Sequence, residues 1–344
     1  MVTLKDIANE VGVSVSTVSR TINGGQSKKP SKKTEEAIWE AVARLGYKPN
    51  SNARNLVSGI VEEKEVETYS IAIILVSPYA TFSTIFFRDM LSLVIDEMQN
   101  TNLQVKYVLS SKGCTTAEFY QKITSVPVDG AIILGVYDEE MFKILQDNIK
   151  YLVYTGMNPV EQCADEVICD GYKSAELALM HLIEEGYKKI GYIGPIHRKK
   201  DRKSNRFIDY KNILQKRNIA LEESCVKEST FEAASGYEAM KAMGDCIPEA
   251  IYCTGDMIAV GAMKYALEQG LRIPEDVAFI GMANRSFSGY MNPSLTTIDV
   301  PKESLSKISV SMLVDKIENK HRDNIRVDVT STLHIRESSK KYFE

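Results

Sequence analysis

Apolar residues near the start of the chain recur at the spacing of an amphipathic helix. The inner face of this first predicted helix carries Leu4, Ile7, Ala8 and Val11. Gly12 ends the helix, because glycine readily adopts the left-handed conformation that follows a helix end. Ser14 can then cap a second helix, in which Val18 and Ile22 face inward. The pattern predicts two short helices joined by a tight turn.

The outward side of the second predicted helix carries short polar and basic side chains. Its members, with the capping serine, are Ser14, Val15, Ser16, Thr17, Ser19 and Arg20. Such side chains at the start of a helix can enter the major groove of DNA, donate to base edges and phosphates, and contact a thymine methyl group. The alternative is a pair of surface helices in an ordinary domain, and the spacing alone leaves both interpretations open.

A third helix is predicted after Ser31, with Ile38, Val42 and Leu45 on one face. Three such helices form a small core, to which Trp39 either adds its ring or stays half-exposed.

A short helical segment follows Pro49. Residues 52–58 can form about two helical turns, which are not stable alone in water. Taken by itself, the segment could also be a plain linker helix with one buried leucine.

From residue 69 onward, short apolar runs alternate with amphipathic helices. The predicted strands are 70–76, 103–109, 130–134, 151–154, 189–193, 250–253 and 277–280, and the predicted helices include 85–98, 172–185 and 258–269. This alternation is typical of parallel sheets covered by helices on both faces. Two such sheets leave a cleft at the carboxyl ends of their strands, where we expect a small ligand.

These patterns divide the 344 residues into a head at 1–59, a charged linker at 60–68 and a core of two α/β subdomains at 69–344. Residues 1–60 carry a net charge of +4, whereas the remainder carries −8. A basic head on an acidic core suits phosphate contacts, although the excess is modest.

Motifs of catalysis and metal binding do not occur in this sequence. The four histidines lack metal-ligand spacing, and GxSxG, GxxxxGK[ST] and GxGxxG are absent. We therefore expect neither an enzyme nor a bound cofactor or metal.

The six cysteines are scattered without a CxxC pair, no signal peptide begins the chain, and no apolar run approaches the roughly 18 residues of a membrane span. These features indicate a cytoplasmic protein with reduced thiols and no membrane partner.

The segments LKDIA, GVS and TVSR, followed by Asn23, occur here in the order found in the lactose/galactose repressor (LacI/GalR) family of bacterial transcription regulators, which this chain resembles. The resemblance continues through 165–194, 247–282 with its PEDV turn, and NPSLTTIDVP at 292–301. It implies an all-α helix-turn-helix head and a core of two doubly wound parallel-sheet subdomains like those of periplasmic binding proteins. The implied function is that of a sequence-specific DNA-binding repressor of sugar-utilisation genes, released by a carbohydrate.

The resemblance also implies what stabilises the short helix after Pro49. Two copies, one from each subunit of a homodimer, would pack in the minor groove at the centre of a near-palindromic operator. Leu56 would act as the apolar wedge between base pairs, beside Asn50, Ala53 and Arg54. No leucine heptad run follows the core, so we expect a dimer rather than a tetramer.

The effector contacts implied by the resemblance are Pro78, Tyr79, Arg206, Phe231, Asp256 and Asn284. Arg206 would donate to sugar hydroxyls, or else form a surface salt bridge. Phe231 would pack on the apolar face of a sugar, or belong to the core. Asp256 would accept bonds from hydroxyls, or stabilise a turn.

One passage departs from the family pattern. Many sugar-responsive members have a pair of aspartates where this chain has Ala283 and Asn284, and alanine cannot accept a hydroxyl hydrogen bond. A galactoside is our first hypothesis for the effector. The alternatives are a regulator whose ligand strengthens DNA binding and a solute-binding protein for uptake, and the DNA-reading head argues against the latter.

Overall fold

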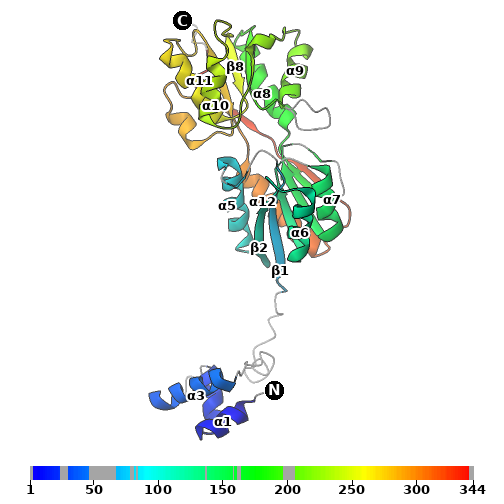
Figure 1. Cartoon of the computed structure of the whole chain (residues 1–344), viewed down its shortest axis with the longest axis vertical. Helices are drawn as coiled ribbons and strands as arrows, with labels where there is room; N and C mark the ends of the chain where they lie inside the picture. The colour runs from blue at the N-terminus through cyan, green and yellow to red at the C-terminus, as the bar shows by residue number, and fades with distance from the viewer. Residues whose placement is uncertain are drawn as a thin grey trace. The chain divides into compact units, whose positions relative to one another are not determined.

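A computed structural model describes most of the chain, and Figure 1 shows its course. The described residues are 3–23, 30–45, 67–77, 81–82, 84–135, 138–157, 159–160, 164–196 and 206–340. Contacts within the chain separate two compact units, Met1–Glu67 and Thr68–Glu344. Within the described residues, no helix has the length and apolar content needed to cross a membrane.

The first unit contains the three helices that the apolar spacing predicts. They are α1 (Leu4–Val11), α2 (Val15–Asn23) and α3 (Lys32–Leu45). The Thr3 hydroxyl accepts a hydrogen bond from the Asp6 amide, and the Asp6 carboxylate accepts one from the Thr3 amide at 2.8 Å, so α1 begins with a capping box. Gly12 ends α1 at φ 72° as expected. The buried core of this unit is Ile7, Ala8, Val18, Ile38 and Ala41.

Two of the predictions for this region cannot be compared with the structure. The side chain of Trp39 and the whole of residues 46–66, which include Asn50, Ala53, Arg54 and Leu56, lie outside the described residues.

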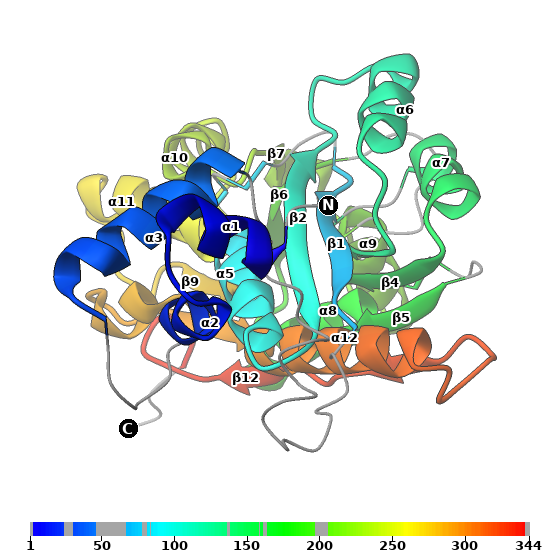
Figure 2. The ribbon, with the colours of Figure 1, turned by 90° about the horizontal axis from the view of Figure 1, so that it is seen from below.

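The first sheet of the second unit is parallel throughout, in the order β11-β5-β4-β3-β1-β2. Its strands are β1 (Tyr69–Leu75), β2 (Leu103–Ser110), β3 (Gly130–Leu134), β4 (Tyr151–Gly156), β5 (Asp165–Ile168) and β11 (Arg326–Asp328). One face is covered by α5 (Ile85–Met98) and α12 (Lys302–Ile317), and the other by α6 (Thr116–Ser125) and α7 (Glu139–Asn148) (Figure 2). These elements form the amino-terminal subdomain.

The second sheet has the order β12-β10-β9-β8-β6-β7. Its strands are β6 (Ile190–Gly194), β7 (Val226–Glu228), β8 (Ala250–Cys253), β9 (Ala278–Met282), β10 (Thr296–Asp299) and β12 (Thr332–His334). Helices α8 (Gly171–Glu184) and α9 (Arg206–Lys216) cover one face, and α10 (Ala233–Lys241) and α11 (Asp256–Glu268) cover the other (Figure 1). These elements form the carboxyl-terminal subdomain.

Burial on both faces explains why the strands are uniformly apolar rather than alternating. Every residue of β3, β6, β8 and β9 is buried, as helix-covered parallel sheets require. On the α10–α11 side the helices approach so closely that a Cβ on Gly261 would overlap the Ala233 carbonyl oxygen. The predicted fold class is thus confirmed, with one difference, because β12 runs antiparallel to β10.

In the part of the core that the structure describes, the chain crosses between the two subdomains three times. It crosses after β5 and again between β10 and α12, and the last crossing joins β11 to β12. As a result α12 and β11, which follow the carboxyl-terminal subdomain in sequence, belong to the amino-terminal one.

Candidate DNA-reading surface and effector site

The first turn of α2 is organised by Ser14. The Ser14 hydroxyl accepts a hydrogen bond from the Thr17 amide at 3.2 Å, which confirms the predicted cap. The hydroxyls of Ser16 and Thr17 lie 2.9 and 2.8 Å from the Ser14 hydroxyl. The turn therefore presents a connected set of hydroxyl groups that can donate or accept hydrogen bonds.

Two other residues complete the outward side of α2. Val15 is 43% exposed, although Val18, three residues later, is fully buried. The Arg20 Nε donates to the Ser16 carbonyl at 3.0 Å, which holds the guanidinium along the same side of the helix. The outward side thus combines an apolar contact, hydroxyls and one positive charge.

In the carboxyl-terminal subdomain, Arg206 and Phe231 lie together. Arg206 is the first residue of α9, and its Nη1 donates to the Thr254 carbonyl, directly after β8, at 2.5 Å. The Arg206 guanidinium also lies over the Phe231 ring, with 5.4 Å between Cζ and the ring centre. Phe231 is 38% exposed, so its ring is not enclosed in the core. The fold thus pairs two of the sequence-predicted effector residues.

Asp256 begins α11 and is 2% exposed. Its carboxylate accepts hydrogen bonds from the Arg285 amide at 2.7 Å, the Ser288 hydroxyl at 2.8 Å and the Thr297 hydroxyl at 2.5 Å. Burial raises the pKa of Asp256, while these hydrogen bonds oppose the rise. Of the two roles left open by the sequence, the geometry supports stabilisation of the turn after β9.

Asn284 lies in that same turn. Its Oδ1 accepts a hydrogen bond from Arg336 Nη2 at 2.8 Å. Ala283 and Asn284 both have left-handed φ angles, 110° and 40°, a conformation that costs free energy for non-glycine residues and persists only where surrounding contacts enforce it. The Asn284 oxygen therefore already accepts one hydrogen bond from a protein group, and its amide N–H groups can donate to a ligand.

Asp209 is a residue that the sequence interpretation missed. It lies in α9, three residues after Arg206. Burial, with a smaller contribution from nearby Asp170, raises the pKa of Asp209 to about 6, and Arg206 opposes the rise. The spacing of three residues from Arg206 places Asp209 near the guanidinium and was the signal available in the sequence. The burial that raises the pKa of Asp209 depends on packing, which the sequence does not show.

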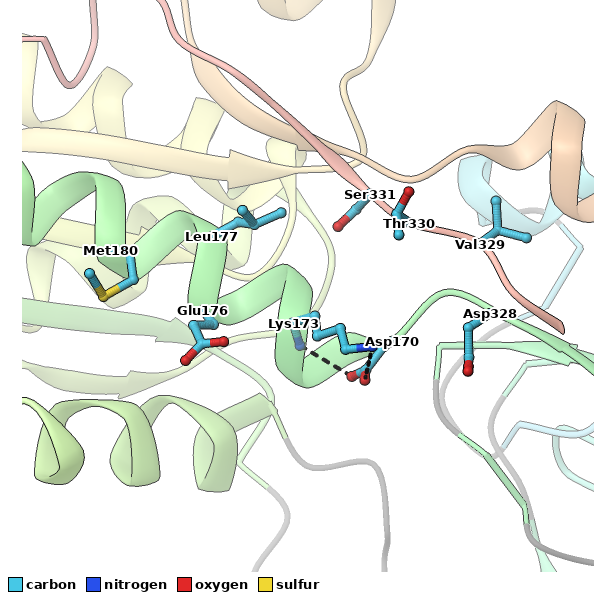
Figure 3. Close-up of a pocket in the computed structure, with 9 residues that line it drawn as sticks. All are labelled: Asp170, Lys173, Glu176, Leu177, Met180, Asp328, Val329, Thr330 and Ser331. Atoms are coloured by element: carbon cyan, nitrogen blue, oxygen red, sulfur yellow. Dashed lines mark hydrogen bonds and ion pairs between the residues drawn. The ribbon is translucent and has the colours of Figure 1, made fainter. Parts of the chain in front are cut away.

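A groove of about 470 Å³ lies between α8 and the crossover at 328–331 (Figure 3). It is lined by Asp170, Lys173, Glu176, Leu177, Met180, Asp328, Val329, Thr330 and Ser331. Asp170 caps α8 by accepting from the Lys173 amide at 3.1 Å, and it also pairs with the Lys173 ammonium at 3.8 Å. None of the predicted effector residues lines this groove, and Pro78 and Tyr79 lie outside the described residues.

No cluster of histidine, cysteine, aspartate or glutamate within the described ranges could hold a metal ion.

Comparison with known proteins identifies the chain. The family model for bacterial regulatory proteins of the lacI family matches residues 3–50, and that for a periplasmic binding protein-like domain matches 179–339. The HTH-type transcriptional repressor PurR of Photorhabdus laumondii subsp. laumondii is 33% identical, over 98% of this chain and 97% of its own length. The chain belongs to the lacI family of bacterial regulatory proteins. PurR of Yersinia enterocolitica is 32% identical over the same shares of both chains.

Solved structures agree with this assignment at the level of the fold. The lac repressor dimer bound to operator and the anti-inducer ONPF superposes with a TM-score of 0.71, at 22% identity over 99% of each chain. The transcriptional regulator CelR in complex with cellobiose gives a TM-score of 0.68, at 24% identity over 98% of this chain and 100% of its own. The predicted architecture is confirmed, and this lacI-family protein is a DNA-binding transcriptional regulator rather than an enzyme.

Proposed function

We propose that this lacI-family regulator is a homodimeric repressor of sugar-utilisation genes that acts in the cytoplasm. Its parts would be a DNA-binding head with hinge helix at 1–59, a linker at 60–68 and an effector core at 69–344. The exposed hydroxyl and apolar groups on α2 support base reading by the head, since side chains of this size fit the major groove. The residues that would enter the major groove, to contact bases or phosphates, are Ser14, Val15, Ser16, Thr17, Ser19 and Arg20.

The proposed hinge contacts are Asn50, Ala53, Arg54 and Leu56. Two hinge helices would form only when both heads engage the half-sites of a near-palindrome, because such a short helix is unstable alone. Leu56 would insert between base pairs of the minor groove.

The observation that carries the effector proposal is the packing of Arg206 on Phe231. A planar guanidinium fork can donate to two neighbouring hydroxyls, while an aromatic ring packs on the apolar face of a sugar. We propose a carbohydrate effector, with a galactoside as the first candidate, held by Arg206, Phe231, Asn284 and the loop at Pro78 and Tyr79. Asp256 would support this site through the turn after β9.

A ligand that strengthens DNA binding is the second candidate function. The observation that favours it is indirect and counts against a sugar as the ligand: the Ala283 side chain has no acceptor, and the oxygens of Asp256 and Asn284 already accept hydrogen bonds from protein groups. A ligand rich in hydroxyl donors would find few partners among these three residues.

Release would follow from a change between the two subdomains. A ligand that closes them would rotate the amino-terminal subdomains of a dimer relative to each other and separate the hinge helices. By linkage, operator DNA must weaken the binding of a releasing ligand by the same factor.

The test is binding of the purified protein to DNA from upstream of its own gene, at fixed salt, with and without galactosides and related sugars. Specific binding released by a sugar would establish the proposal, and binding strengthened by a ligand would establish the second candidate. A Leu56→Ala variant should lose operator affinity but keep sugar affinity. Unchanged operator affinity in that variant would refute the hinge assignment.

A further inference from the structure

An ionic contact between side chains joins the two subdomains. The Asp89 carboxylate, on α5 of the amino-terminal subdomain, accepts from Arg285 Nη1 at 2.7 Å. Arg285 belongs to the turn after β9 in the carboxyl-terminal subdomain. Every other ion pair between described residues of the core lies within a single subdomain.

The same carboxylate oxygen also accepts from Lys302 Nζ at 2.9 Å. Lys302 begins α12, directly after the second crossover. The side chains of Arg285 and Lys302 are 11% and 14% exposed, and that of Asp89 is 30% exposed. One carboxylate therefore balances two largely buried cations, and Arg88 adds a further positive charge nearby.

Arg285 also connects this contact to the candidate effector site. Its backbone amide donates to Asp256, and its neighbour Asn284 is held by Arg336. Movement of α5 relative to the turn would therefore strain the backbone that carries Ala283 and Asn284, both in left-handed conformations.

We propose that Asp89 is a positioning residue that holds the Ala283–Arg285 turn against α5 and so couples the effector site to the amino-terminal subdomain. The regulatory consequence of this inference rests on the proposed function. The contact between Asp89 and Arg285 does not depend on that function. A ligand that binds at Asn284 would act on Arg285 and, through Asp89, on α5.

The charge arrangement predicts which of two substitutions loosens the contact between the subdomains more, and a merely steric role for Asp89 would not produce this ranking. Asp89→Asn leaves two cations side by side without their carboxylate, whereas Arg285→Gln leaves a balanced Asp89–Lys302 pair. The first variant should therefore loosen the subdomain contact more than the second. Asp96→Asn is the matched control, because Asp96 lies exposed on the same helix.

The experiment is hydrogen–deuterium exchange of the full chain without DNA or ligand. We expect amides of the 283–290 segment to exchange about tenfold faster in Asp89→Asn, less so in Arg285→Gln, and unchanged in Asp96→Asn. Strands β6 and β8 serve as the internal reference for global unfolding. If Asp89→Asn fails to fold, faster exchange at the start of α5 in Arg285→Gln carries the same test. Unchanged exchange in both variants, or the reverse order, would overturn the proposal.

A second measurement separates this inference from the proposed function. If a sugar releases the operator, the sugar concentration for half release should shift by severalfold in Asp89→Asn and return toward the parent value in Asp89→Glu. An exchange effect without any sugar response would leave the Asp89 contact standing and reject the sugar effector.

Discussion

The Arg206 guanidinium lies over the Phe231 ring at 5.4 Å, although 24 residues separate them in sequence. One residue starts α9 and the other precedes α10, and these helices cover opposite faces of the second sheet. Their meeting point is next to Thr254, where β8 ends. A strand end between two helices thus brings a hydrogen-bond donor and an aromatic ring together.

Replacement of Arg206 by alanine should weaken effector binding. Loss of charge-assisted hydrogen bonds to a ligand costs about 2 kcal/mol, or roughly thirtyfold in Kd. Titration calorimetry with the releasing sugar would measure this loss. Arg272→Ala is the control, since Arg272 pairs with Asp276 at the surface. Equal sugar affinity in the Arg206 variant and the parent protein would remove Arg206 from the site.

Asp209 should make stability depend on pH. Its folded-state pKa of about 6 lies above the ordinary value, so the folded chain binds more protons than the unfolded chain between about pH 4 and pH 6. The stabilisation that Asp209 gives to the folded state through this extra proton is fully present below about pH 4. It is lost as the pH rises through about 6. Asp209→Asn should therefore raise the free energy of unfolding at pH 7.5 by about 1 kcal/mol, after allowance for solvent screening.

Denaturant unfolding at a series of pH values would measure the effect of Asp209→Asn. The exposed Asp245 offers the matched variant, Asp245→Asn, which should change nothing. A parent-like pH profile in Asp209→Asn would contradict the assignment.

Gly261→Ala should destabilise the carboxyl-terminal subdomain by about 3 kcal/mol, because the new methyl group would overlap backbone atoms of α10. Gly255→Ala serves as comparison, since its Cβ would meet Phe231 at an ordinary 3.4 Å. The denaturation midpoint of the core is the measurement. Similar midpoints for both variants would show that α10 and α11 can separate at little cost.

Arg20→Ala should weaken binding to all DNA sequences about equally. It should also make the slope of log K against log salt concentration shallower by about one, because one fewer counterion is released. Val15 substitutions should instead change the preferred base at one position, because Val15 offers an apolar contact rather than a charge. Fluorescence anisotropy across a salt series separates the two effects. A sequence-dependent loss in Arg20→Ala would indicate a base contact in place of a phosphate contact.

Local patterns in the sequence predicted much of the fold. The helix at Ile85–Met98 and the strands at Gly130–Leu134 and Ala250–Cys253 have the predicted limits, because apolar periodicity and turn residues act over neighbouring positions. The Ser14 cap and the Gly12 helix end are equally local. Family motifs spread over the chain extended these predictions to the DNA-reading head.

The tertiary structure decided what depends on residues far apart in sequence. Apolar spacing does not show that α12 and β11 return to the amino-terminal subdomain, because sheet order is set by packing between distant segments. Nor does it show that Asp256 is buried beneath the turn after β9, that Asp209 is desolvated, or that Asp89 joins the two subdomains. The sequence by itself determined the kinds of helices and strands and the class of regulator. The free energy of burying and pairing charges is settled only when those elements pack together.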